Sequence, residues 1–347
     1  MNQPTRIYIV VLLTVLYSGH SLAKTCKKNA PLAPAGIICF KIATLAPAGT
    51  TWMKLMRQGA KSIGEKTDGR VKLKFYPGGV MGNDQSVHRK IKVGQLHGGA
   101  FTSGGLEHIY PGIQALSLPM VFKSIDEVDY VRSKMDAFLK QNMELGGFVL
   151  LGIANGGFAR IMSQQPLTDL EAIRSSKVWI PEGDTVVLET YKSLGISPIS
   201  LSIADVFTGL QTGLIETVAI TSTAAIAFQW HSSTAYLTDI PVIFLTGLLG
   251  IQKKSFDKIS AGDQIIVKQE IDHVFKQMDR LNRSDNEKAT EALKNYGIKY
   301  VKPDPEELRR WKKLSDQAIA NMASSGIVTQ EAVDQVLQHL GEYRKAQ

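Results

Sequence analysis

The sequence lacks the signatures of an enzyme or a metalloprotein. It has two cysteines and seven histidines, and none of these residues forms a His-Glu-x-x-His or His-x-His pattern. It has no Gly-x-Ser-x-Gly elbow and no phosphate-binding loop, and the glycine-rich stretch 78–82 is better interpreted as a turn. Because catalysis needs a placed nucleophile, base or metal, we expect no enzymatic activity, no catalytic residue, no metal and no cofactor. Turnover that depends on His231 or Ser103 would revive the enzyme class.

Long apolar runs and basic runs are also missing from most of the chain. The apolar stretch Pro241–Ile251 is interrupted by two glycines and is too short to cross a bilayer. The formal net charge is +8, but the 40 Lys and Arg residues are dispersed among 32 acidic residues, without a basic run or an aromatic RNA-binding motif. We therefore expect a solvated surface and no nucleic-acid partner. A weak attraction to anionic membrane surfaces stays open.

The amino terminus has the pattern of a secretory signal peptide. Arg6 precedes the apolar run Ile7–Leu16, and small residues follow up to Ala23. This run is too short for a membrane span, so we expect residues 1–23 to be a signal peptide that is cleaved after Ala23. The mature protein is then expected in the periplasm.

Cys26 and Cys39 both lie in the expected mature chain. In an oxidising compartment an even pair of cysteines favours one disulfide, which here would fasten the mature amino terminus to the first strand. A metal site with two cysteines is the rival, but neither a histidine nor a second cysteine pair lies near them. A lipid anchor on Cys26 lacks the small residues that would precede it.

The first half of the chain alternates strand and helix patterns. The nearly continuous apolar run Gly36–Leu45 is typical of a buried parallel strand. A helix over 53–66, a strand over Val71–Tyr76, a helix capped by Asn83 or Asp84, and a strand from Gly98 follow. This order predicts a βαβ unit.

The stretch from Gly157 to Glu216 predicts a second α/β unit. Strand candidates at Arg160–Met162 and Val178–Ile180 flank a helix start, where Thr168 can act as the N-cap and Glu171 can reach back. A helix over 204–212 is expected to end at Gly213. A strand–helix–strand unit of this kind builds a parallel sheet whose strand ends open into a ligand crevice. From Ser255 onward, helical patterns predict a tail in two main parts, the first ending at Gly297.

Several long motifs resemble one family. They are Ala43-Thr-Leu-Ala-Pro-Ala-Gly-Thr-Thr-Trp52, Tyr76-Pro-Gly-Gly-Val-Met-Gly82, Leu116-Ser-Leu-Pro-Met-Val-Phe122 and Pro166-Leu-Thr-Asp-Leu170. The chain resembles the DctP-like solute receptors of TRAP transporters over nearly its whole mature length. The resemblance implies an α/β, two-lobed periplasmic binding protein (type II-like) with a long bracing helix and a helical C-terminal tail.

The resemblance also implies a division of the chain and a function. Residues 24–153 would form mainly lobe I, with the crossover near 119–150, and 154–240 mainly lobe II; 241–347 would return to lobe I and add the bracing helices. Such a receptor captures a small molecule by lobe closure and delivers it to TRAP membrane subunits, which use an ion gradient. A tetratricopeptide-repeat protein is the alternative partner, and an envelope efflux or lipid-transfer accessory or a scaffold is the alternative class.

The resemblance points to two positions in the crevice. In this family two arginines grip an anionic ligand, and Arg160 matches one of them, whereas Trp179 stands at the position of the other. Trp179 offers an apolar face and one N–H donor, so it either stacks on a ligand or only fills the crevice. Arg160 either binds a ligand or pairs with a nearby acid to hold two loops together.

Six further residues in loops at predicted strand ends are second-line candidates for ligand contact. They are Trp52, Thr102, Ser103, Phe158, Thr221 and Gln229. Trp52 could instead be a core residue at a helix start, and Thr221 could be a helix cap. Because the sequence around Thr221 is poor in charge and Trp179 replaces an arginine, we expect a neutral, apolar or aromatic ligand. A receptor that binds an organic acid through Arg160 alone is the alternative.

Overall fold

Two long strands organise the molecule. In the computed structural model, which describes residues 36–347, β4 (Phe148–Ser163) and β8 (Tyr236–Gln252) have 16 and 17 residues and pair antiparallel. Strands usually have about 3–10 residues. Nearly every side chain of β4 is buried, because helices cover both faces of the sheet at this strand. Both predicted lobe boundaries, after residues 153 and 240, fall inside these strands.

On one side of the long strands the chain builds the unit that we call lobe I. It contains β1 (Ile38–Thr44), β2 (Val71–Tyr76) and β3 (Gly98–Thr102). β1 pairs parallel with β2 and β3, and β3 joins the sheet antiparallel to β8. The predicted βαβ unit is therefore confirmed here. The connecting helices are α1 (Thr51–Lys66) and α2 (Asp84–Lys92), and Asn83 caps α2 as predicted.

On the other side lies the unit that we call lobe II, and here the predicted connection of strands is wrong. The candidate Arg160–Met162 is the end of β4, which pairs antiparallel with β8 and with β7 (Thr217–Ile220). β5 (Trp179–Pro181) instead forms a separate parallel pair with β6 (Ile199–Leu201). The N-cap of α4 (Leu170–Ser175) is Asp169 and not Thr168. The remaining elements of lobe II are α5 (Thr185–Ser193), α6 (Val206–Gln211) and α7 (Ser222–Ala227).

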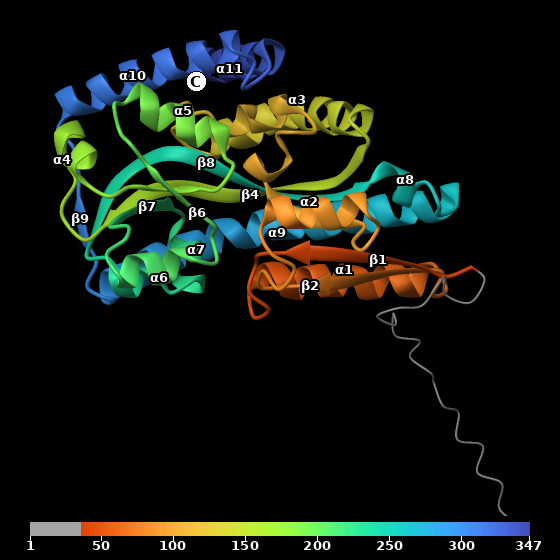
Figure 1. Cartoon of the computed structure of the whole chain (residues 1–347). Coiled ribbons are helices and arrows are strands. Elements are labelled where there is room, and N and C mark those ends of the chain that lie inside the picture. The colour runs from red at the N-terminus through yellow and green to blue at the C-terminus, as the bar shows by residue number, and fades with distance from the viewer. Residues whose placement is uncertain (1–35) are drawn as a thin grey trace, which may run out of the picture.

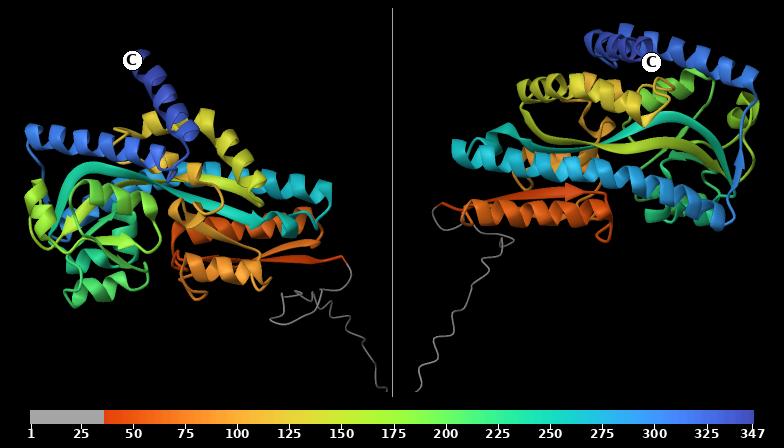
Figure 2. Two further views of the ribbon diagram at one scale, coloured as in Figure 1. Left: turned by 45° about the horizontal axis from the view of Figure 1, so that its top comes forward. Right: turned by 180° about the vertical axis from the view of Figure 1, so that it is seen from behind.

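The helices lie in layers on the two faces of the sheet (Figure 1). α9 (Ala261–Asn295) has 35 residues and runs from α1 to α7, in contact with β4. On the other face lie α3 (Ile125–Leu145), α10 (Pro305–Ser324) and α11 (Gln330–Lys345), as Figure 2 shows from two further sides. The remaining elements are α8 (Lys253–Phe256), β9 (Lys299–Val301) and three short 3₁₀ helices, η1 (Gly104–Leu106), η2 (Pro111–Ser117) and η3 (Trp230–Ser233).

The long bracing helix predicted for the tail is confirmed. α9 ends before Gly297, which has a φ of +88°, as predicted for the residue after a helix. The second predicted part of the tail contains two helices, because Gly326 separates α10 from α11. Of the helices in residues 36–347, none is long and apolar enough to cross a membrane. The predicted signal peptide and Cys26 lie outside the described residues, so the cleavage site and the disulfide with Cys39 stay predictions.

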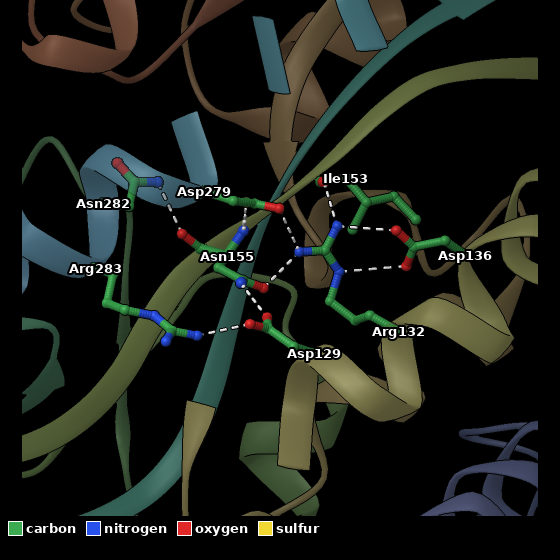
Figure 3. A network of polar contacts seen from close by, with 8 residues as sticks. All are labelled: Asp129, Arg132, Asp136, Ile153, Asn155, Asp279, Asn282 and Arg283. Atoms are coloured by element: carbon green, nitrogen blue, oxygen red, sulfur yellow. Dashed lines mark hydrogen bonds and ion pairs between the residues drawn. The ribbon is translucent and has the colours of Figure 1, made fainter. Parts of the chain in front are cut away.

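A polar network holds β4 between α3 and α9 where the two lobes meet (Figure 3). Asn155, buried in β4, uses both its backbone groups and both ends of its side chain. Its backbone N–H donates to Asp279 (2.6 Å) and its side-chain amide donates to Asp129 (2.8 Å), while its side-chain oxygen accepts from Arg132 (2.5 Å). Asn282 donates to its carbonyl oxygen. The network ties the middle of the long strand to both helix layers.

Arg132 of α3 is the cation at the centre of this network. It is 7% exposed and pairs with Asp136 and with Asp279, in both cases at 2.9 Å. Its guanidinium also donates to the carbonyl oxygen of Ile153. Because a buried charge is tolerated only when it is paired and hydrogen-bonded, this complete set of partners explains how an arginine is accommodated against the sheet.

Candidate functional site

A cavity of about 130 Å³ lies between the lobes. Thr102 and Ser103 line it from lobe I, and Trp179 and Pro181 line it from lobe II. Most of its wall is apolar and comes from α4, α5, β7, β8 and α10 as well as from the ends of β4 and β5. Members of this apolar wall include Ile161, Ile173, Trp179, Ile220, Leu245 and Trp311. A concave, mainly apolar cavity with a few polar groups is the usual form of a small-molecule site.

The ionisable groups of the wall are acids. Among the described residues that line the cavity, none is a lysine, an arginine or a histidine. Asp184 lines it, and burial raises the pKa of its carboxyl to about 6, although backbone N–H groups at the start of α5 oppose the shift. Tyr191 also lines it, and burial raises the pKa of its phenol to about 12. The wall therefore offers negative or neutral groups to a ligand.

Acidic residues from both lobes meet beside this cavity. Burial and the nearby Asp184 raise the pKa of Asp84, at the start of α2, to about 7. Burial also raises the pKa of Glu107, although its carboxylate accepts hydrogen bonds from the hydroxyl (2.7 Å) and the N–H of Thr185. Asn83 donates to Glu182 across the same contact, at 2.6 Å. The contact between the lobes is therefore rich in carboxyl groups.

Trp179 lies in the wall of the cavity, and its ring packs into lobe II. It is 3% exposed, its Nε1–H donates to the carbonyl oxygen of Leu201 (3.0 Å), and it meets Trp230 edge to face with the ring centroids 5.2 Å apart. The indole donor is therefore already used within the protein. What Trp179 offers to the cavity is apolar surface.

Arg160 does not line the cavity. Its Nε donates to the carboxylate of Asp239 at 3.0 Å, and Lys302 pairs with the same carboxylate at 3.5 Å. The next residue, Ile161, does line the cavity, whereas neither Arg160 nor its partner Asp239 does. This arrangement corresponds to the alternative in which Arg160 is held by an acid. The arginine and Trp179 are therefore not brought together.

Of the second-line candidates, Thr102 and Ser103 line the cavity. Trp52 lies outside the wall and contacts Phe275 edge to face, with its ring against the backbone of Gly247. Phe158 meets Phe244 edge to face in the packing around α3. These two aromatic residues belong to hydrophobic cores.

Thr221 and Gln229 also lie outside the wall of the cavity. The hydroxyl of Thr221 accepts a hydrogen bond from the N–H of Ala224, so this residue caps α7, which is the alternative the sequence allowed. Gln229 is exposed and has a φ of +61° before η3. Neither residue contributes to the cavity.

The sequence pattern identified only Thr102, Ser103 and Trp179 of the wall, and the residues it missed include Ser117, Thr246 and Trp311. Trp311 lies on the apolar stripe that predicts α10, but the stripe alone does not show that it covers a cavity. Ser117 ends η2, whose path cannot be predicted from local spacing. Thr246 lies within an apolar strand, where a single threonine is unremarkable.

Comparisons with known proteins give one family. The model of the family described as "DctP: Bacterial extracellular solute-binding protein, family 7" matches residues 42–325. The uncharacterized protein YiiZ of Salmonella typhimurium is 28% identical over 202 residues, which are 56% of this chain and 61% of YiiZ. The sialic acid-binding periplasmic protein SiaP of Vibrio cholerae is 22% identical over 256 residues, 72% of this chain and 78% of SiaP.

Solved structures of similar fold include a TRAP periplasmic solute-binding protein from Desulfovibrio salexigens with bound orotic acid. It has a TM-score of 0.80 and 16% identity and covers 88% of this chain and 99% of its own. The sugar acid binding protein DctPAm from Advenella mimigardefordensis, in complex with galactonate, has a TM-score of 0.81 and 18% identity and covers 88% of this chain and 98% of its own. The predicted fold class, an α/β two-lobed binding protein, is therefore confirmed.

Proposed function

The chain belongs to family 7 of the bacterial extracellular solute-binding proteins, the DctP family, and from this premise we propose that it is the periplasmic receptor of a TRAP transporter. It captures a small molecule between its lobes and delivers it to TRAP membrane subunits. Contacts between the lobes, such as Asn83 with Glu182 and Glu107 with Thr185, support a closed form. A ligand that binds this form better than an open one shifts the equilibrium toward closure.

We propose further that the ligand is uncharged and mainly apolar. The observation that carries this proposal is the wall of the cavity, which among the described residues contains mainly apolar side chains, several hydroxyl groups and the acid Asp184, but no cation. A carboxylate moved into such a site without a positive partner costs on the order of several kcal/mol. An apolar body loses nothing there, because burial of apolar surface is favourable by about 25 cal/mol per Å².

The volume of the cavity sets the size of the ligand. A dry engineered cavity of roughly 150 Å³, lined by aliphatic and aromatic side chains, holds benzene. The cavity of about 130 Å³ in this chain is of that order. The ligand therefore has about the size of a single ring, with Trp179 as part of the surface that it contacts.

An organic acid is the second candidate. The solved structures of similar fold include proteins with bound orotic acid, β-D-galacturonate and L-gulonate. In this chain an acid would need Arg160 to leave Asp239 and turn toward the cavity. The proposal of an apolar ligand and this alternative differ in the charge of the bound molecule.

The proposal also covers the export of the protein, its disulfide and its membrane partner. Residues 1–23 direct secretion and are removed after Ala23, and Cys26 then pairs with Cys39 in the periplasm. The intact mass of the mature protein tests the cleavage site and the disulfide, because removal of residues 1–23 fixes the chain mass and the disulfide lowers it by two hydrogens. Crosslinking in membranes distinguishes TRAP subunits from a tetratricopeptide-repeat partner.

Ligand class is tested by thermal unfolding in the presence of two panels of compounds. One panel contains uncharged single-ring aromatic compounds, and the other contains C4 dicarboxylates, sialic acid and galacturonate. The proposal predicts that the first panel raises the melting temperature, because a ligand stabilises the form to which it binds. Stabilisation by members of the second panel alone would favour the organic-acid receptor.

A further inference from the structure

Three of the polar groups that line the cavity are buried hydroxyls. Ser103 and Ser117 are 4% and 2% exposed, and their oxygens share one hydrogen bond of 3.0 Å. Thr246 is 4% exposed, and within residues 36–347 its hydroxyl has no hydrogen-bond partner. All three residues line the cavity. We name this set, Ser103, Ser117 and Thr246, the hydroxyl cluster.

Strand register explains why these residues come together. β3 pairs with β8 so that Thr102 lies opposite Gly247. Ser103 directly follows Thr102, and Thr246 directly precedes Gly247, so the antiparallel register places them side by side. Ser117 ends η2, and two residues further Pro119 also lines the cavity. The backbone of Met120 is fixed by a hydrogen bond of 2.9 Å to the carbonyl oxygen of Val242 in β8.

The hydroxyl cluster has hydrogen-bonding capacity left over. Each hydroxyl has one donor and two acceptor lone pairs. The bond between Ser103 and Ser117 uses one of their two donors, and Thr246 uses none. Buried hydroxyls are normally paired, so a buried hydroxyl that has no partner within the protein and lines a cavity is suited to a ligand atom. The remaining donors suit one acceptor oxygen of a ligand.

We propose that the hydroxyl cluster binds the single polar atom of the ligand, an uncharged carbonyl-type oxygen, while its apolar body lies against Trp179 and the apolar wall. This inference rests on the proposed function and adds the class of head group. A carbonyl accepts the donors of the cluster without needing a cation. Asp184 in the same wall disfavours a carboxylate, and a pure hydrocarbon would leave the hydroxyl of Thr246 unpaired.

The test compares three probes of one shape by isothermal titration calorimetry: acetophenone, α-methylstyrene and benzoate. They share a phenyl ring and differ in whether they present a neutral oxygen, a methylene group or a charged carboxylate. The proposal predicts that acetophenone binds about tenfold more tightly than α-methylstyrene, as expected for one neutral hydrogen bond made in a buried site. Benzoate should bind more weakly than acetophenone.

Two variants assign the preference to the hydroxyl cluster. Thr246→Val keeps the shape of the side chain and removes its hydroxyl. In this variant acetophenone should lose its advantage and bind about as tightly as α-methylstyrene, whose affinity should not change. Thr190→Val is the matched control, because Thr190 also lines the cavity but donates its hydroxyl to the carbonyl oxygen of Val186 (2.7 Å). It should keep the preference. Circular dichroism checks that both variants fold.

The outcomes separate this inference from the proposed function. If acetophenone and α-methylstyrene bind equally, or if Thr246→Val leaves the preference intact, the role of the hydroxyl cluster is overturned and the apolar receptor stands. If benzoate binds most tightly and Arg160→Met abolishes its binding, the organic-acid alternative replaces both. If none of the three probes binds at its solubility limit, both proposals fail for a ligand of this size.

Discussion

Arg160 donates from Nε to the carboxylate of Asp239 at 3.0 Å, and neither side chain of this pair lines the cavity. Both side chains are about a quarter exposed, at 27% and 29%. The arginine that the family resemblance assigns to a ligand thus has a partner within the protein. Variants can show whether Arg160 binds the ligand or only stabilises the fold through its pair with Asp239.

Arg160→Met should leave the binding of an uncharged ligand unchanged. Removal of a partly exposed ion pair should cost about 0.5–1 kcal/mol of unfolding free energy, because solvent screens the attraction. Asp239→Asn is the matched control, since it breaks the same pair from the other side and keeps the arginine. Calorimetric titration and urea unfolding of both variants check this. Loss of ligand binding in Arg160→Met, but not in Asp239→Asn, would show that the arginine contacts the ligand.

Trp179 should matter for stability as well as for ligand contact. Trp179→Phe removes the hydrogen bond to Leu201 and part of the contact with Trp230, so we expect a loss of about 1–3 kcal/mol in chemical unfolding. Trp179→Arg would bury a guanidinium at a site that is 3% exposed, and we expect a loss above about 3 kcal/mol. A Trp179→Arg variant that keeps the wild-type melting temperature and gains affinity for dicarboxylates would contradict this assignment.

The acidic contact between the lobes should make stability depend on pH. The pKa of Asp84 is raised from 3.8 to about 7, so the folded protein binds more protons than the unfolded chain between these values. The stability that protonated Asp84 contributes is therefore complete below about pH 4 and is lost as pH rises through about 7. Burial raises the pKa of Asp184 and of Glu107 in the same sense, whereas His88, with its pKa lowered to about 4, stays neutral over most of this range.

Asp84→Asn isolates this contribution. Between pH 5 and 8 the wild-type unfolding free energy should fall by about 1–2 kcal/mol more than that of the variant, after allowance for solvent screening. Asp68→Asn is the control, because Asp68 is exposed and asparagine tolerates its φ of +48°. Urea unfolding over this pH range gives both slopes. If the unfolding free energies of the wild type and of Asp84→Asn change equally with pH, Asp84 does not cause the pH dependence.

The network around Asn155 should be the most sensitive polar element of the fold. Asn155→Ala leaves the buried Arg132 and the exposed Asp129 each without one partner and also empties a buried position, so we expect a loss of about 2–4 kcal/mol. Asn282→Ala removes one hydrogen bond to the backbone of Asn155 and should cost about 1 kcal/mol. Guanidinium unfolding measures the difference between the two variants. Similar losses would mean that the network does not act as a unit.

The sequence predicted well those features that are set by local backbone chemistry. Asn83 at a helix start and Gly213 and Gly297 after helix ends were identified, because caps and left-handed turns depend on a few adjacent residues. Strand pairing in lobe II was not predictable in this way. Arg160–Met162 looks like a short separate strand, but neighbours far along the chain make it the end of β4.

The site was harder to predict than the fold. β4 changes its register with β8 at Asn155/Gly157 and again at Ala159/Ile161. Each irregularity disturbs the alternation of side chains, so the face on which Arg160 lies cannot be obtained by counting along the strand. The free hydroxyl of Thr246 likewise depends on what other strands place near it. Both features follow from tertiary packing.

The charge of the natural ligand tests the central claim most directly. We would purify the protein from the envelope of its native cells, denature it, and identify the released molecule by mass spectrometry. The account predicts an uncharged, mainly apolar molecule of about single-ring size with one carbonyl-type oxygen. A dicarboxylate or a sugar acid, released in an amount equal to the protein, would contradict the account.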